Sequence, residues 1–403
     1  MAGEFKVNGV SFATESGGTL TVNNSKVRLP SSGNGIEDSS GNSVLSESGG
    51  KTSINLTGDF VPSNSFMFRN KVINGGMKIA QRGTSTAFAH DGTTNGYVLD
   101  RFRIYLNNTD EYDCTVSQHS MSAAELNTTG HSKALKLLTG TAESAIANDE
   151  YVRIDTKLEG QDIQDLQYGT AGAKSSTLSF WVNSSVTGTY GITFYSQSSQ
   201  ARALNATYTI NSANTWEKKT ITIVGDTVES SPDDNTLGMM VVWSLASGSN
   251  YDGVNSTSWS NYTTTNLNGG HQQDGVVTTA SAVFYLTGVQ WEVGSSATPF
   301  EHRPIGMELS LCQRYYQDLG RWLIQGQAYG SGNDGLGYPI RWITTMRAAP
   351  QILEQFVTHG GSNADLVFNQ ITKFGCSPEA LKISGNSGTN IYYLTDIQAE
   401  AEL

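Results

Sequence analysis

The stretch FYLTGVQWEVGSSATPFEHRPIGMELSLCQRYYQ, residues 284–317, changes its pattern part-way along. Up to residue 293, apolar and polar residues alternate, which is typical of a strand that buries one face. The alternation predicts a buried face made of Val283, Tyr285, Val289, Trp291 and Val293. After Pro299, apolar residues recur at spacings of three and four, as they do along one side of a helix. The stretch therefore predicts a junction between a β-domain and a helix.

The predicted helix covers residues 305–320 and carries two apolar stripes. One stripe has the a/d spacing of a coiled coil and consists of Ile305, Leu309, Cys312 and Tyr316. About three turns of helix are not stable alone in water, so this helix must be buried against something. Two arrangements remain open: the helix packs on its own β-domain, or it forms a symmetric neck with the same helix of other copies.

Residues 61–304 contain many segments of strand length with turn signals between them, and no long helical pattern. Examples are STLSFWVNSS at 176–185 and LGMMVVWSLAS at 237–247. Such a series predicts a two-sheet jelly-roll sandwich. Three tryptophans fall within strand patterns and are expected in its core: Trp181, Trp216 and Trp291.

The two ends of the chain also read as β-structure. Residues 1–60 form very short strand patterns with too few apolar residues to offset the entropy of ordering, so they predict either a shaft shared by several chains or a partly disordered leader. Alternation returns in residues 321–403, which predict a small C-terminal β tip domain. The expected fold class is all-β: an N-terminal short β-repeat shaft, a central jelly roll, a short helical neck and a C-terminal β-domain.

Composition excludes several classes of function. Charged residues make up 15% of the 403 residues, against about 25% in typical globular proteins, and 43 are glycine. A net charge of −12 without a basic patch argues against a nucleic-acid partner. No membrane-spanning stretch or export signal is visible. Three widely separated cysteines, Cys114, Cys312 and Cys376, are expected to be small buried side chains without disulfides.

No catalytic or metal-binding pattern stands out. Hydrolysis of a polysaccharide would need two facing carboxylates, and none of those available lies in a recognisable motif. The candidates are Glu159, Glu292, Glu301, Glu308, Asp233 and Asp234. Glu292 is expected to point to solvent or to an inter-chain partner, since it alternates with a tryptophan. The six histidines form no ligand pair, so the sequence predicts no zinc site. We also expect no cofactor and no enzyme activity.

Sugar binding needs aromatic faces beside amides or carboxylates. The polar loop 247–275 offers Tyr251, Trp259 and Tyr262, with the alternative that Trp259 folds back to cap the sandwich. A second candidate patch flanks the glycine-rich hairpin of the C-terminal domain and consists of Tyr329, Tyr338 and Trp342.

Several blocks together resemble a known family. NGGMKIAQRGTS, YVLDRF, LSFWVNSSVTGTYGITF, YTINSANTWEKKTITIVGD and the stretch that opens this section resemble tail-fibre and related virion structural proteins of tailed bacteriophages, particularly those of marine cyanobacterial phages. The match runs in order from Asn74 to Gln317. It implies a jelly roll similar to carbohydrate-binding modules, carried in a homotrimeric fibre that contacts the host surface.

The resemblance implies a function for each segment. We expect a non-catalytic receptor-binding subunit of the virion that binds a bacterial surface glycan or an outer-membrane receptor, with residues 1–60 contacting other tail proteins. In a homotrimer, Ile305, Leu309, Cys312 and Tyr316 would line the interface between copies. The alternatives are a tail-spike polysaccharide depolymerase and a purely structural fibre or decoration protein. In each case residues 284–317 are expected to be a domain junction and not an active site.

Overall fold

The computed structural model describes residues 4–7, 10–16, 19–22, 34–37, 43–48, 51–54, 68–89, 92–197, 200–327, 335–337, 339–360, 364–382 and 390–403. The chain forms two compact units, Met1–Ser63 and Asn64–Leu403. In the first unit, β1 (Glu4–Val7), β2 (Val10–Ser16) and β3 (Thr19–Val22) form one antiparallel sheet. A second antiparallel sheet contains β4 (Asn34–Glu37), β5 (Ser43–Ser48) and β6 (Lys51–Ile54).

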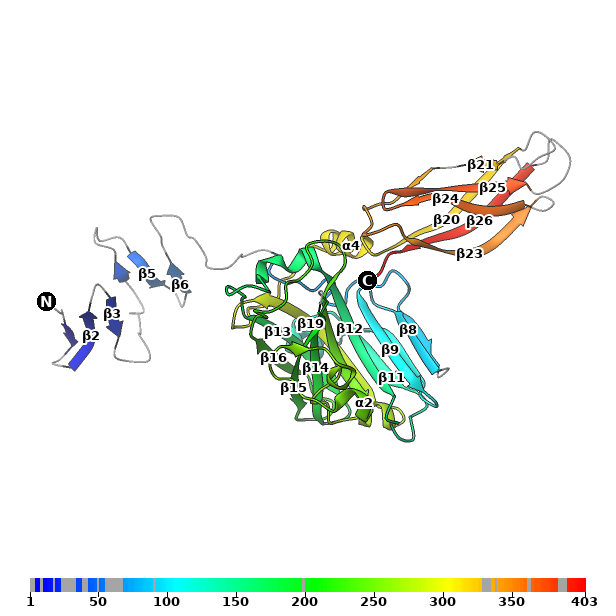
Figure 1. The fold of residues 1–403 in the computed structure, drawn as a ribbon. Coiled ribbons are helices and arrows are strands. Elements are labelled where there is room, and N and C mark those ends of the chain that lie inside the picture. The colour runs from blue at the N-terminus through cyan, green and yellow to red at the C-terminus, as the bar shows by residue number, and fades with distance from the viewer. Residues whose placement is uncertain are drawn as a thin grey trace. The chain divides into compact units, whose positions relative to one another are not determined.

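The second unit begins with a sandwich of two antiparallel sheets (Figure 1). The six-stranded sheet has the order β16 (Glu217–Ile223), β13 (Ser176–Ser184), β19 (Val283–Val293), β11 (Lys133–Thr139), β10 (Cys114–Ser120) and β7 (Ser85–Phe88). The seven-stranded sheet has the order β18 (Ser260–Asn261), β15 (Arg202–Ile210), β14 (Gly188–Ser196), β17 (Leu237–Ser247), β12 (Tyr151–Glu159), β9 (Phe102–Thr109) and β8 (Gly92–Tyr97). The predicted all-β fold with a two-sheet sandwich is confirmed.

Alternating side chains from both sheets fill the space between them. On β13, Leu178, Phe180 and Val182 are fully buried in the core, and Ile192 and Phe194 of β14 reach it from the other sheet. The side chains between these positions therefore face outward, as the period of two requires. Trp181 is one of them, so the expectation that it belongs to the core is wrong, whereas Trp291 is fully buried there.

The buried face of β19 differs from the predicted one because the strand contains an irregularity. The register of β13 and β19 shifts between Ser179 and Trp181, and Gly288 of β19 has a φ of +61°. An extra residue in one strand reverses which side chains face inward beyond it. Before Gly288 the core receives Phe284 and Leu286, so the predicted burial of Val283 and Tyr285 is wrong, and after Gly288 it receives Val289 and Trp291 as predicted.

Short helices connect the strands. They are α1 (Ala123–Thr129), α2 (Ser249–Asp252), α3 (Gly275–Thr278) and α4 (Ile305–Gln313), with 3-10 turns at Gly160–Leu166 and Thr264–Asn266. In α1, the Ser122 side chain accepts from the backbone N–H of Glu125, and the Glu125 carboxylate accepts from the N–H of Ser122. This reciprocal cap fixes the start of α1. Among the described residues, no helix has the length and apolar character needed to cross a membrane.

The helix α4 is shorter than residues 305–320. Tyr316 begins strand β20 (Tyr316–Gln327), where it pairs with Glu400, so it does not continue the helical stripe. Cys312 and Tyr316 are buried within the chain itself, whereas Ile305 is 57% exposed. Of the predicted seam, only Ile305 and the half-buried Leu309 remain near the surface.

Beyond α4 the chain forms two further antiparallel groups of strands. One contains β20, β26 (Asn390–Glu400) and β23 (Gln351–Gly360). The other contains β21 (Gly335–Gly337), β22 (Ile340–Arg341), β24 (Ala364–Thr372) and β25 (Gly375–Lys382). A small core of its own holds this region, including Ile340, Met346, Cys376 and Ile397. All three cysteines are free and buried, as predicted.

Candidate functional site

A row of tyrosines lies on the outer face of the seven-stranded sheet. Val152 and Ile154 of β12 and Ile104 and Leu106 of β9 enter the core, so the side chains between them point outward. The rings of Tyr105 and Tyr151 stack at 5.7 Å between centroids with an interplanar angle of 17°. We call the following set the tyrosine row: Tyr105, Tyr151, Tyr195, Tyr251 and Tyr262.

Two members of the tyrosine row, Tyr251 and Tyr262, lie outside the long strands of the sheet and contact tyrosines on those strands. Tyr251, in α2, meets the ring of Tyr151 edge-on at 4.7 Å, and Tyr262 meets Tyr195 of β14 edge-on at 4.8 Å. Burial raises the pKa of Tyr151 to about 12, with smaller contributions from the neighbouring tyrosines. Burial also raises the pKa of Tyr262. These phenols are therefore neutral near pH 7 and can donate or accept hydrogen bonds.

Two arginines lie among these rings. The guanidinium carbon of Arg153 is 5.0 Å from the ring centre of Tyr105 and 5.1 Å from that of Tyr151, and Arg103 is 4.9 Å from Tyr105. Asp155 accepts from Arg103 Nη2 at 2.8 Å and from Arg153 Nε at 3.2 Å. A carboxylate shared in this way fixes both guanidinium planes, since a buried charge is stable only when it is paired. Flat apolar faces thus alternate with fixed hydrogen-bond donors, which suits a polyhydroxylated ring.

The residues predicted to bind sugar fall into different environments. Tyr251 and Tyr262 belong to the tyrosine row. Trp259 instead packs against the sandwich core, with its ring edge-on to Tyr168 at 5.6 Å and its indole N–H donating to the Val224 carbonyl at 2.8 Å. This is the capping arrangement weighed above as the alternative.

Only Trp342 of the second predicted patch lies within the described residues. Trp342 is 6% exposed in the C-terminal core, and its indole N–H donates to the carbonyl of Thr372 at 2.8 Å. Its ring therefore offers little face to a ligand. Tyr329 and Tyr338 lie outside the described residues.

Sequence reasoning missed the strand members of the tyrosine row, although a signal was present. Arg103 and Tyr105 are two residues apart, and so are Tyr151, Arg153 and Asp155 in turn. A spacing of two places such residues on one face of a strand, and a face that repeats aromatic and charged residues is not a core face. That two such strands are neighbours was not visible in the sequence, because β9 and β12 are separated by β10, α1 and β11.

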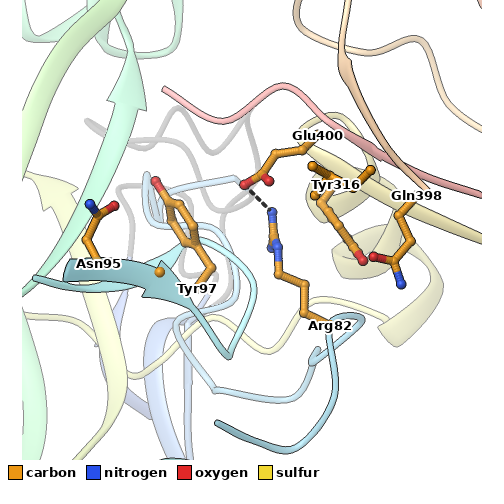
Figure 2. Close-up of a pocket in the computed structure, with 8 residues that line it drawn as sticks. Arg82, Asn95, Tyr97, Tyr316, Gln398 and Glu400 are labelled. Atoms are coloured by element: carbon orange, nitrogen blue, oxygen red, sulfur yellow. Dashed lines mark hydrogen bonds and ion pairs between the residues drawn. The ribbon is translucent and has the colours of Figure 1, made fainter. Parts of the chain in front are cut away.

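A separate pocket of about 390 Å³ lies where β8 meets the C-terminal strands (Figure 2). Arg82 extends into it, with its Nη2 3.1 Å from carboxylate oxygens of both Glu400 and Glu402. Its guanidinium carbon is 3.8 Å from the ring centre of Tyr316 and 5.0 Å from that of Tyr97. The Arg82 guanidinium is thus paired with carboxylates and aromatic rings of the chain itself.

Arg101 repeats this arrangement deeper in the structure. It is 1% exposed, pairs with Glu402, and places its guanidinium carbon 3.4 Å from the ring centre of Tyr315. Removing one partner from a buried ion pair is strongly destabilising, so both arginines hold the C-terminal segment that contains Glu400 and Glu402. We therefore interpret the pocket of Figure 2 as a structural clamp.

The carboxylates considered for hydrolysis are engaged in structural contacts. Glu159 is fully buried and accepts from Arg314 Nε and Nη2, each at 2.7 Å. Glu292 is 2% exposed and accepts from the backbone N–H and the hydroxyl of Thr298, so the expectation that it points to solvent is wrong. Glu301 accepts from the backbone N–H of Asn70 at 3.0 Å. Within the described part of the chain, no group of three or more His, Cys, Asp or Glu side chains could hold a metal ion.

Comparison with known proteins gives only distant structural similarity. The sequence matches no family model and no curated protein. The enzymatically active domain of tailspike protein 4 of bacteriophage CBA120 aligns with 56% of this chain and 21% of its own length, at 12% identity and a TM-score of 0.28. The aligned part is thus about a fifth of that tailspike domain.

Two carbohydrate-binding modules align over nearly their whole length. The family 11 module from Clostridium thermocellum covers 54% of this chain and 99% of itself at 9% identity, with a TM-score of 0.25. The N-terminal cellulose-binding domain of Cellulomonas fimi β-1,4-glucanase C covers 55% and 95% at 9% identity, with a TM-score of 0.22. Similarity at this level does not establish a common function.

Proposed function

We propose that this chain is a glycan-binding, receptor-recognising subunit of a phage tail fibre. The observation that carries the proposal is the tyrosine row, in which Tyr105 and Tyr251 each contact Tyr151. The fixed guanidinium of Arg153 lies beside the rings of Tyr105 and Tyr151. Aromatic faces beside oriented donors are what sugar recognition requires. The virion setting rests on the sequence resemblance to tail-fibre proteins, and the host cell surface is then where the chain acts.

Binding without hydrolysis is part of the proposal. A glycosidase needs two opposed carboxylates, one of which is free to give or take a proton. Beside the tyrosine row, the carboxylate of Asp155 is fully buried and held by two arginines. Glu159, on the same strand, is held by Arg314. A tail-spike depolymerase and a purely structural fibre protein remain the competing functions.

The assembly proposed is a homotrimer that joins other tail proteins through the N-terminal unit. On α4, Ile305 is 57% exposed and Met307 is 38% exposed, so contact with another copy would cover apolar side chains that this chain leaves at its surface. Light scattering of the purified chain should give three times the mass of one chain. A monomer would leave α4 packed only on its own unit.

Mutation of the tyrosine row tests the binding function. Purified full-length chain should bind to an array of bacterial lipopolysaccharides and capsular polysaccharides, and Tyr251→Ala should weaken that binding by about 1–3 kcal/mol. Tyr285→Ala is the matched control, because Tyr285 is a half-buried tyrosine on the opposite sheet. Equal loss in both variants would argue against the tyrosine row.

The same array separates the competing functions. A binding protein retains the polysaccharide without producing new reducing ends, whereas a depolymerase releases oligosaccharides. Failure to retain any polysaccharide would favour the structural role.

A further inference from the structure

Another pocket lies on the outer face of the six-stranded sheet, which is the face of the sandwich opposite to the tyrosine row. Its volume is about 310 Å³. We call it the His131 pocket, and its walls include His131, Ser179, Trp181, Lys218, Phe300 and His302. Trp181 and Lys218 are direct cross-strand neighbours on β13 and β16, and Phe300 and His302 come from the link between β19 and α4. The link predicted to be only a domain junction thus supplies one wall of a pocket.

The side chain of His131 is the most unusual feature of this pocket. It is 2% exposed, and its Nδ1 has no hydrogen-bond partner among the described residues. The ring meets Phe300 edge-on at 4.6 Å, and its centre is 5.6 Å from that of His302. Nε2 of the same ring lies toward Gly288, which lines the pocket, whereas the unpaired Nδ1 is buried. Leaving a buried donor unpaired costs about 1–3 kcal/mol, so the proton is better placed on Nε2, where a ligand in the pocket can accept it.

The backbone has been shaped to admit this imidazole. Gly288 has a φ of +61°, and a Cβ atom there would lie 2.5 Å from His131 Nε2 and 3.0 Å from Trp181 Cδ1. A glycine at this place therefore keeps open the space between the histidine and the tryptophan. The β-bulge of β19 is what places Gly288 there.

The residues that line the pocket include one lysine, Lys218, in a chain whose net charge is −12. Burial lowers the pKa of His131 to about 4, and the positive charges of His302, Lys78 and Lys218 add to the effect. No carboxylate is among the residues that line the pocket. The adjacent Glu301 accepts from the backbone N–H of Asn70, and its carboxylate lies 3.7 Å from Nε of Arg303, which balances its charge.

We propose that the His131 pocket binds a carboxylate-bearing pyranose, with the carboxylate at His131 and Lys218 and the sugar ring against Trp181 and Phe300. The volume is at the lower end of the ~300–1,000 Å³ of small-molecule sites, which suits one sugar residue. The neutral imidazole donates one N–H to the carboxylate, and Lys218 contributes a charge-assisted hydrogen bond. The half-buried Trp181 and Phe300 supply apolar faces for the C–H groups of the ring.

This proposal is separate from the tyrosine row. The two sets of residues lie on the outer faces of different sheets of the sandwich, and they share no member. Binding at the His131 pocket can therefore be measured whether or not the tyrosine row binds a glycan.

Calorimetric titration of the full chain with three probes tests the proposal. Glucuronate and glucose share a ring and differ in the carboxylate, and acetate supplies the carboxylate without a ring. We expect glucuronate to bind about tenfold or more tightly than glucose, which lacks the charged hydrogen bond, and than acetate, which lacks the ring contacts.

Two substitutions in the pocket test these contacts. Lys218→Gln and Trp181→Ala should each lower the affinity for glucuronate about tenfold, and neither should raise the affinity for glucose.

Lys136→Gln is the matched control, because Lys136 lies on the outer face of the same sheet outside the pocket. It should leave glucuronate binding unchanged. Equal affinity for glucose and glucuronate would overturn the role of the charge, and equal affinity for acetate and glucuronate would overturn the role of the ring. Absence of glucuronate binding, or equal losses in Lys218→Gln and Lys136→Gln, would overturn the site itself.

Discussion

Substitution of Gly288 by alanine is the sharpest test of how the sandwich is built. Gly288 lies in the bulge of β19 with a φ of +61°, where an L-residue is disfavoured by roughly 1–2 kcal/mol. The added Cβ would also lie 2.5 Å from His131 Nε2, well inside the normal contact distance between a carbon and a non-bonded nitrogen. The imidazole must then move, although Phe300 already contacts its other side.

The expected loss combines these two effects. Forcing an extra methyl group into a packed site costs about 1–3 kcal/mol. Added to the backbone cost, this gives a loss of about 2–5 kcal/mol in the free energy of unfolding. Denaturant unfolding of the full chain, followed through the transition of the sandwich, measures this loss.

Gly130→Ala is the matched control. Gly130 ends α1 with a φ of +77°, and a Cβ there would have no atom within 4 Å. It therefore carries the backbone cost alone, roughly 1–2 kcal/mol. The difference between the two variants isolates the contact with His131. If both variants lose the same stability, the close approach to His131 is not the reason why position 288 requires a glycine.

Two further predictions concern buried charges. Arg314→Met should cost about 3–5 kcal/mol, because it leaves the fully buried Glu159 without its cation, whereas Arg321→Met should cost at most about 1 kcal/mol, because the Arg321–Asp396 pair is exposed. Thermal or denaturant unfolding compares them, and similar losses would contradict the assignment. His131 has its pKa lowered from an ordinary 6.5 to about 4, so the unfolded chain takes up a proton that the folded chain does not. Its contribution to stability should be present above pH 6.5 and disappear as the pH falls from about 6.5 to 4, and His131→Gln should lose this part of the pH dependence. An unchanged pH profile in that variant would show that His131 is not the titrating group.

Much of the fold was predictable because its signals are local. Alternation along residues such as Leu178, Phe180 and Val182 identifies a strand without knowledge of its neighbours, and the free, buried cysteines followed from their spacing. The inward face of β19 was predicted correctly only beyond Gly288. A bulge is a property of two paired strands, so a single strand's pattern does not reveal it.

The candidate sites were less predictable because they are assembled from distant segments. The loop 247–275 was chosen for its aromatic and polar content, and Tyr251 and Tyr262 do join other tyrosines. Trp259 carries the same chemical signal but caps the core, since the choice depends on where a hydrogen-bond acceptor such as the Val224 carbonyl lies. The His131 pocket draws on β13, β16 and the segments before β11 and α4, an arrangement that no local pattern encodes.

The sandwich presents its two candidate surfaces on opposite outer faces, and this has a consequence for the glycan binding that we propose. A single sugar chain lying flat along one face cannot reach the other face without curving around an edge of the sheets. Two separate strands of an envelope polysaccharide could instead be held at once, one on each side. Each captured strand would raise the local concentration of the next, so that weak individual contacts add up to firm attachment while each can still release and rebind.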